Sequence, residues 1–239
     1  MKKRKIVIFT DCVDIAFNEI YRSLENEFNL SNYEDYDIDP CVEIPPFSVM
    51  NAAFLIRLMA DLYGPGTMFL VIMNSLSSNP ERIFGKTKKG ITFVGNNSGY
   101  FNWMLKDHGV EYIYKNTIDR EKDGRSFGGK YVQVPTACSL MATSRNSDFG
   151  IQVNESILRD YTIKNGTVVH IDNFGLIKIF FDKELGFPEG KKLKITINGK
   201  TSLDVIYSQH LKRHEDGIWV LFKGSSLGGL PEIGKVRSK

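Results

Sequence analysis

The chain has few cysteines, and none of them are close together in the sequence. Cys12, Cys41 and Cys138 are spread over 239 residues and form no Cys-x-x-Cys motif. An odd number of distant cysteines argues against a disulfide framework and against a cysteine-ligated zinc site. The pattern is typical of a reducing compartment, so we expect a cytoplasmic protein with no bound metal.

Long apolar runs and a strong charge of one sign are also missing. No segment approaches the ~20 apolar residues that a membrane-spanning helix needs. The apolar run 6–9 is too short for a signal peptide, since it meets Asp11 almost at once. The formal net charge of +3 is too small to indicate a nucleic-acid partner. We therefore expect neither a membrane nor a nucleic acid as a partner.

Common nucleotide-binding and hydrolase signatures are absent. No Gly-x-Gly-x-x-Gly follows a strand, and neither a Walker motif nor a Gly-x-Ser-x-Gly elbow occurs. The glycine-rich segment Phe127-Gly128-Gly129-Lys130 lacks the spacing of a phosphate loop, and by itself it predicts only a turn.

The first part of the chain alternates between predicted strands and helices. Buried strands are expected at residues 6–9, 42–44 and 67–73, and helical spacing marks 15–28 and 49–62. Ser48 is a predicted N-cap of the second helix. A hairpin over 83–94 and helices over 100–106 and 132–141 follow. This order predicts an α/β domain with a mostly parallel sheet.

The last part of the chain changes to short strands. The strong hairpin turn Asn198-Gly199 lies among them. We place the boundary in the polar stretch before Gly150, which gives an α/β domain over 1–146 and a smaller all-β, barrel-like domain over 147–239. The expected strands are 167–171, 176–181, 193–197, 203–207 and 218–222.

Polar side chains follow two of the predicted parallel strands. In open α/β sheets, ligands bind beyond the carboxyl ends of the strands. Asp11 follows the first strand, and Asn74 and Ser77 follow the strand that ends at Met73. Asp11 also suits the cap of the next helix, and its position leaves both roles open. Arg82, after the same polar loop, suits a surface position as well as a site.

In order and spacing, several of these loops resemble one family. They are similar to the S-adenosylmethionine (SAM) hydrolases that form adenosine, also called SAM hydroxide adenosyltransferases, which are relatives of the SAM-dependent fluorinase and chlorinase. The matching segments span nearly the whole chain: Thr10-Asp11, Ile44-Pro45-Pro46, Pro65-Gly66-Thr67, Arg82, Asn97-Ser98-Gly99, His108-Gly109, Phe127-Gly128-Gly129-Lys130, Asp172-Asn173-Phe174-Gly175 and Ser225-Ser226.

The resemblance implies a fold, an assembly and a reaction. It implies an α/β domain followed by a β-barrel domain, in a homotrimer that binds SAM between neighbouring subunits. It also implies displacement at C5′ of the ribose with release of L-methionine, and SAM is then a substrate, with no cofactor. The sulfonium is already a good leaving group, so a dry pocket that holds both reactants in line accelerates attack.

The resemblance also assigns substrate contacts to individual residues. The ribose hydroxyls bind Asp11, and the sugar lies against an aromatic ring at Phe47. The methionine ammonium is held by the carboxylates of Asp14 and Asp172. The adenine lies between the rings of Phe174 and Tyr207. The methionine carboxylate meets the hydroxyls of Ser225 and Ser226.

At the nucleophile the chain departs from the family pattern. The hydrolases activate water with an aspartate, an arginine and a histidine, whereas Asn74 and Gly128 stand at the first and last positions and only Arg82 is kept. Asparagine cannot take a proton near neutral pH. Ser77 falls where the halogenating relatives carry a hydroxyl, and Gly129 resembles a glycine of the chlorinase.

Three functions are compatible with this pattern. The first is hydrolysis of SAM to adenosine and L-methionine, with Arg82 and Asn74 holding the water or hydroxide. The second is displacement by chloride or another anion, for which Ser77 and Gly129 argue. The third is a non-catalytic binder of an adenosyl ligand, because two of the three water-activating groups are lost.

Overall fold

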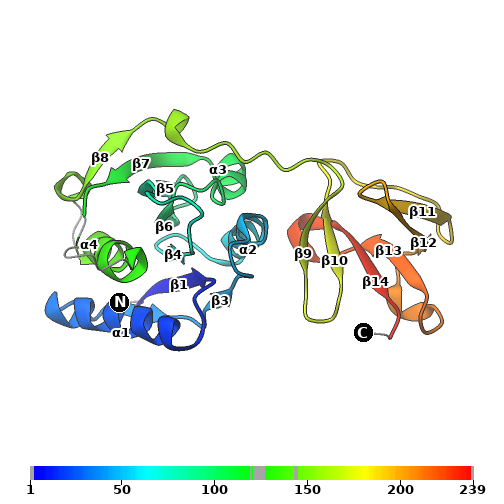
Figure 1. Cartoon of the computed structure of the whole chain (residues 1–239), viewed down its shortest axis with the longest axis horizontal. Helices are drawn as coiled ribbons and strands as arrows, with labels where there is room; N and C mark the ends of the chain where they lie inside the picture. The colour runs from blue at the N-terminus through cyan, green and yellow to red at the C-terminus, as the bar shows by residue number, and fades with distance from the viewer. Residues whose placement is uncertain (1–2, 119, 121–126, 143–144, 238–239) are drawn as a thin grey trace. The chain divides into compact units, whose positions relative to one another are not determined.

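The computed structural model describes residues 3–118, 120, 127–142 and 145–237. The chain forms two compact units, Met1–Tyr161 and Thr162–Lys239 (Figure 1). This division comes later than the boundary expected after residue 146, because strand β8 (Gly150–Val153) pairs with strand β7 (Val110–Asn116) in the sheet of the first unit. In the described part of the chain, no helix has the length and apolar character to cross a membrane.

The first unit is built on a mixed eight-stranded sheet with the order β2-β1-β4-β6-β5-β7-β8, in which β3 also pairs with β1. The strands β1, β3 and β4 run parallel, as predicted, and β2 and β6 run parallel with them, while β5, β7 and β8 are antiparallel to their neighbours. The remaining bounds are β1 Arg4–Thr10, β2 Tyr36–Ile38, β3 Val42–Glu43, β4 Met68–Ile72, β5 Arg82–Thr87 and β6 Thr92–Asn96.

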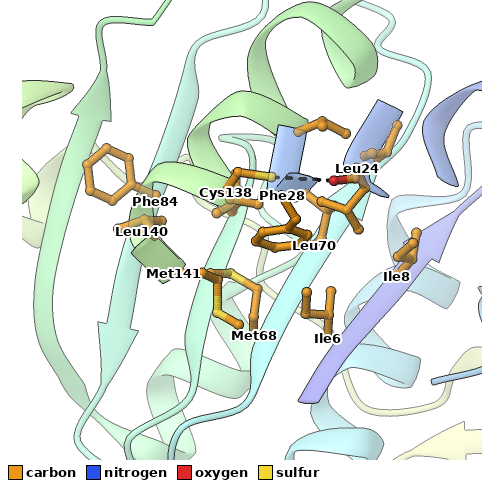
Figure 2. Close-up of a cluster of buried hydrophobic side chains, with 14 of the residues drawn as sticks. Ile6, Ile8, Leu24, Phe28, Met68, Leu70, Phe84, Cys138, Leu140 and Met141 are labelled. Atoms are coloured by element: carbon orange, nitrogen blue, oxygen red, sulfur yellow. Dashed lines mark hydrogen bonds between the residues drawn. The ribbon is translucent and has the colours of Figure 1, made fainter. Parts of the chain in front are cut away.

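Helices cover both faces of this sheet. Helix α1 (Asp14–Leu30) packs beside α4 (Val134–Ala142), and α2 (Val49–Leu62) packs beside α3 (Asn102–His108). Side chains alternate between the faces of a strand, so every second residue of β1 points to one helix pair. Figure 2 shows Ile6 and Ile8 of β1 on the side of Leu24 and Phe28 of α1 and Cys138 of α4. The predicted α/β class is confirmed.

Two local features predicted from the sequence, the N-cap of α2 and the β5–β6 hairpin, are present in the structure. Ser48 caps α2, since its Oγ accepts the N–H of Asn51 at 3.4 Å. The predicted hairpin is formed by β5 and β6, which places Arg82 opposite Asn96 in the ladder. Because β5 runs antiparallel to β6, its first residue lies at the edge where the parallel strands end. The hairpin therefore brings Arg82 to the carboxyl edge of the sheet.

The second unit is a curled six-stranded sheet with the order β11-β12-β13-β14-β10-β9 (Figure 1). A small core joins its strands through Ile179, Val205, Leu221 and Ile233. The predicted all-β class is confirmed, although β12 and β13 pair in parallel. The bounds are β9 Thr167–Ile171, β10 Ile177–Phe180, β11 Lys192–Ile197, β12 Thr201–Tyr207, β13 Trp219–Lys223 and β14 Pro231–Lys235.

Candidate functional site

A cavity of about 260 Å³ opens at the carboxyl edge of the sheet in the first unit. It is bounded by the loops after β1 and β4, by the start of β5, and by the start of the helical segment at Gly128. All five candidate catalytic residues line it, namely Asn74, Ser77, Arg82, Gly128 and Gly129. Asn96 and Gln133, which the sequence interpretation did not single out, line it as well.

Asp11 stands directly behind the wall of this cavity and joins three loops. Only 6% of the residue is exposed. Its Oδ1 accepts the backbone N–H of Asn74 at 2.9 Å, and its Oδ2 accepts the backbone N–H of Phe47 at 2.9 Å. Hydrogen bonds to an ionised acceptor are stronger than neutral ones. The carboxylate therefore fixes the loops after β3 and β4 to the end of β1.

Phe47 has an unusual backbone conformation and an open side chain. Its φ is +60°, a left-handed value that is costly for a bulky aromatic residue. The bond from its N–H to Asp11 holds this conformation, and 49% of the residue remains exposed. Strained backbone conformations of this kind cluster at active sites and ligand-binding sites, so Phe47 is a candidate ligand contact.

The loop after β4 presents carbonyl and hydroxyl groups to the cavity. The side-chain Nδ2 of Asn74 donates to Asp11 Oδ1 at 3.3 Å, which turns Asn74 Oδ1 away from the carboxylate. Ser75 Oγ accepts the N–H of Ser77 at 3.0 Å, and Ser77 Oγ accepts the N–H of Asn79 at 3.3 Å. These local bonds shape the loop and leave the hydroxyl hydrogens of both serines able to donate.

Arg82 fits against Gly128, where the absence of a side chain leaves room for the guanidinium. A Cβ at Gly128 would lie 2.5 Å from Arg82 Nη2 and 3.2 Å from its Cζ. The guanidinium therefore takes the space that a side chain at residue 128 would fill. Gly129 makes a similar close approach, since its Cβ would lie 2.6 Å from Ile72 Cγ2. The two glycines bring the backbone of this turn against Arg82 and β4.

Replacing Gly128 by alanine is expected to displace the Arg82 guanidinium and to lower activity at this site by about 100-fold, as a misplacement of about 1 Å can do. The group that must move is the far end of a flexible side chain, so the melting temperature should hardly change. Gly64→Ala is the matched control, because a Cβ there would meet nothing within 4 Å. Steady-state kinetics and thermal melting of both variants check this. Equal activity of the two variants would show that activity does not depend on the absence of a side chain at Gly128.

The floor of the cavity is a network of side-chain amides. Gln133 Nε2 donates to the carbonyl of Val71 at 2.9 Å and, at 3.5 Å, to Asn96 Oδ1. Asn96 Nδ2 donates to the carbonyl of Met73 at 3.3 Å. Gln133 ends a π-helical turn, Gly129–Gln133, that precedes α4. Such turns are rare and are frequent at functional sites.

The cavity has a simple charge pattern. Among the described residues that line it, Arg82 is the one charged side chain. Cys12 also lines it, and burial raises the pKa of its thiol, which stays neutral at physiological pH. In the described part of the chain, no group of three or more histidine, cysteine or acidic residues could hold a metal ion. The arrangement suits an uncharged or anionic reactant held by Arg82, hydroxyls and amides.

Asp14, expected at the methionine ammonium, lies exposed at the start of α1. Its φ is +56°. Its Oδ1 accepts the N–H of Ile15 and, at 3.4 Å, that of Ala16. The carboxylate thus bonds the first turn of the helix, where a negative charge is favourable.

In the second unit, Asp172 organises the turn that carries Phe174. Its Oδ1 accepts the N–H groups of Phe174 and Leu176, both at 3.0 Å, and its Oδ2 lies 3.5 Å from Lys178 Nζ. Lys178 in turn pairs with the buried Glu232 at 2.9 Å. The turn leaves Phe174 75% exposed, which suits a ring that stacks on a ligand.

The other predicted contacts of this unit lie elsewhere on its sheet. Tyr207 is half-buried at the end of β12, and its ring meets Phe187 edge-on with centroids 5.6 Å apart. Ser225 is exposed, whereas Ser226 is buried. They precede three residues of positive φ, namely Leu227, Gly228 and Gly229, and this tight turn leads into β14.

Comparison with known proteins places this geometry in a family. Residues 31–150, half of the chain, match the model of the SAM hydroxide adenosyltransferase N-terminal domain. The chain belongs to the SAM hydroxide adenosyltransferase family. The match contains the β4 loop, Arg82 and the turn at Gly128, which supply most of the cavity wall. The family membership indicates that the protein uses SAM in adenosyl transfer.

Solved structures show the same fold over nearly the whole chain. An uncharacterized conserved protein from Thermotoga maritima gives a TM-score of 0.77 at 19% identity, covering 96% of this chain and 92% of its own. A conserved hypothetical protein from Thermus thermophilus gives 0.75 at 17% identity, covering 99% and 93%. Comparison with curated proteins gives no significant match.

Proposed function

We propose that this member of the SAM hydroxide adenosyltransferase family hydrolyses SAM to adenosine and L-methionine. The observation that carries the proposal is the cavity at the carboxyl edge of the first unit, where Arg82 is the one charged side chain among the described lining residues. A guanidinium in a partly enclosed site favours hydroxide and the negative charge on an attacking oxygen.

The proposed chemistry needs no general acid. Attack at C5′ turns the positively charged sulfonium into a neutral thioether, so the leaving group requires no proton. Arg82 lowers the free energy of a bound hydroxide, and Asn74, whose amide orientation Asp11 fixes, orients the nucleophile. Holding the nucleophile and C5′ in line contributes the rest of the acceleration.

For the substrate we propose the contacts that the family resemblance implies. Asp11 and Phe47 bind the ribose, and Asp14 and Asp172 bind the methionine ammonium. Phe174 and Tyr207 enclose the adenine, and the methionine carboxylate meets Ser225 and Ser226. SAM enters as substrate, without a separate cofactor, and a cytoplasmic location remains a prediction.

A homotrimer is part of the proposal. Three exposed apolar residues, Val13, Phe47 and Leu76, lie on the loops that follow β1, β3 and β4, and a fourth, Ile15, lies in the first turn of α1; they are 49–88% exposed. Apolar side chains gathered on loops around a polar site are typical of a surface that another protein surface covers. Association of copies of the chain would remove these side chains from water.

Incubating the purified protein with SAM is expected to produce adenosine and methionine in equal amounts, resolved by chromatography against an enzyme-free control. The reason is that one C5′–S bond is broken for each oxygen added. Absence of both products above background, together with SAM binding by calorimetry, would instead establish a non-catalytic adenosyl-ligand binder.

Displacement by chloride or another anion is the second candidate. It is favoured by the combination of Arg82 with the hydroxyls of Ser75 and Ser77 at a cavity that lacks carboxylates among its described lining residues. Gly129 leaves the turn beside them without a side chain. The same incubation with halide salts decides it, because a 5′-halo-5′-deoxyadenosine would appear in place of adenosine.

A further inference from the structure

Gln133 is the most deeply buried polar side chain of the cavity floor. It is 2% exposed, at the end of the π-helical turn, and the helix that follows it, Val134–Ala142, is mainly apolar. Both hydrogens of its Nε2 are used, one on the Val71 carbonyl and one on Asn96 Oδ1. Because both partners are acceptors, the orientation of the amide is fixed, and its nitrogen cannot exchange places with its oxygen.

The oxygen of the same amide has no such partner. Gln133 Oε1 accepts no hydrogen bond from any residue in the described ranges. It is also not among the fully enclosed polar atoms that lack a partner in that part of the chain, so it is open to the cavity that Gln133 lines. Because no described residue donates to this acceptor, it favours water or a ligand that donates a hydrogen bond.

We propose that Gln133 is a catalytic residue that binds the nucleophile through Oε1, and that the nucleophile is therefore water. The proposal rests on the proposed cleavage of SAM and names the reactant of that step. A halide has no hydrogen to donate, and it would leave Oε1 unpaired beside a negative charge. Water donates to Oε1 and accepts from Arg82, and Asn74 Oδ1 offers a second acceptor on the same cavity.

The step balances without a further reactant. The water oxygen forms a bond to C5′ while the C5′–S bond breaks, and the electron pair of that bond stays on sulfur as the neutral thioether of methionine. One proton of the bound water passes to solvent, which leaves the hydroxide that Arg82 stabilises, and its remaining hydrogen donates to Gln133 Oε1. Neither Gln133 nor Asn74 takes the proton near neutral pH. Gln133 thus orients the water and does not act as its base.

Gln133→Met tests this role, because methionine has similar volume but no acceptor oxygen. We expect kcat for SAM cleavage to fall about 100-fold, with KM within about threefold of the parent, since the contact is to the nucleophile and not to SAM. Gln152→Met on β8 is the matched control. Gln152 is exposed and accepts only the hydroxyl of Tyr114, at 3.3 Å, among its described contacts. Its kinetics should equal those of the parent.

Gln133→Glu keeps the test valid if the methionine variant does not fold. The protonated acid still donates to Val71 and keeps a carbonyl acceptor, so this variant should retain more activity than Gln133→Met. Its carboxyl group is titratable, and we expect kcat to gain an inflection with pH that the parent lacks. In ¹⁸O-labelled water, one labelled oxygen should enter the 5′-hydroxyl of adenosine.

Two results would overturn the inference while leaving SAM cleavage intact. One is a folded Gln133→Met variant with kcat within about twofold of the parent, or a pH profile of Gln133→Glu that superimposes on that of the parent. The other is a product that contains a halide in place of solvent oxygen. A parent protein that does not cleave SAM at all would overturn the proposed function and this inference together.

Discussion

Replacing Arg82 by alanine is expected to abolish cleavage of SAM, lowering kcat by about 1,000-fold while the dissociation constant for SAM changes by less than about threefold. The guanidinium lies against Gly128 and is the one charged group among the described lining residues of the cavity. Its loss removes the stabilisation of a bound hydroxide but leaves the adenosyl contacts in place. Product formation and calorimetry on the same preparation separate the two effects.

The matched control removes an arginine that has no part in the cavity. Arg22 lies on α1, with 75% of its side chain exposed, and pairs with Glu25 at 2.6 Å. Arg22→Ala should cleave SAM at the parental rate, because exposed ion pairs contribute little to stability. Arg82→Lys adds a second comparison, since it keeps the charge but not the planar guanidinium. Undiminished cleavage by Arg82→Ala would remove Arg82 from the mechanism.

Asp11→Asn is expected to lower both stability and activity. The carboxylate accepts backbone N–H groups from two loops, and an amide nitrogen in place of one oxygen would face an N–H donor instead of accepting it. Loss of one charge-assisted bond at this buried position predicts a decrease of about 2 kcal/mol in the free energy of unfolding. The position of Asn74 would no longer be fixed, so kcat/KM should fall about 100-fold.

Asp37→Asn is the control for this change. Asp37 pairs with Lys5 at the surface, and 51% of its side chain is exposed, so its replacement should alter urea denaturation far less than Asp11→Asn. Denaturation curves and steady-state kinetics of both variants measure the two consequences. Parental stability of Asp11→Asn would show that the carboxylate does not hold the loops.

Much of the fold could be predicted because the local signals agree with the tertiary structure. The buried strand at the N-terminus, the helix capped by Ser48 and the hairpin around Lys88-Lys89-Gly90 each have a strong local pattern. Strand β7 was not predicted, because Val110–Asn116 mixes tyrosines with charged residues. Its strand conformation depends on pairing with β5 and β8. That pairing also explains why the first unit extends past the expected boundary.

The candidate site could be predicted only in part, for a physical reason. Residues after the parallel strands, such as Asn74, were expected at the carboxyl edge because all parallel strands end there. The contact between the Arg82 guanidinium and Gly128 could not be predicted, since it depends on how closely two segments distant in sequence approach each other. Gln133 was missed, although one signal was present: a glutamine in the mainly apolar segment 132–141.

The described residues that line the cavity belong to the first unit, and most of them come from two short stretches, 72–82 and 127–133. Changes within these stretches can alter which nucleophile is held without touching the sheet of the second unit. A few substitutions in these stretches could therefore change the nucleophile that the protein uses. A substitution at Asn74, Gly128 or Gln133 would change the groups that face the nucleophile and leave the sheet of the second unit unchanged.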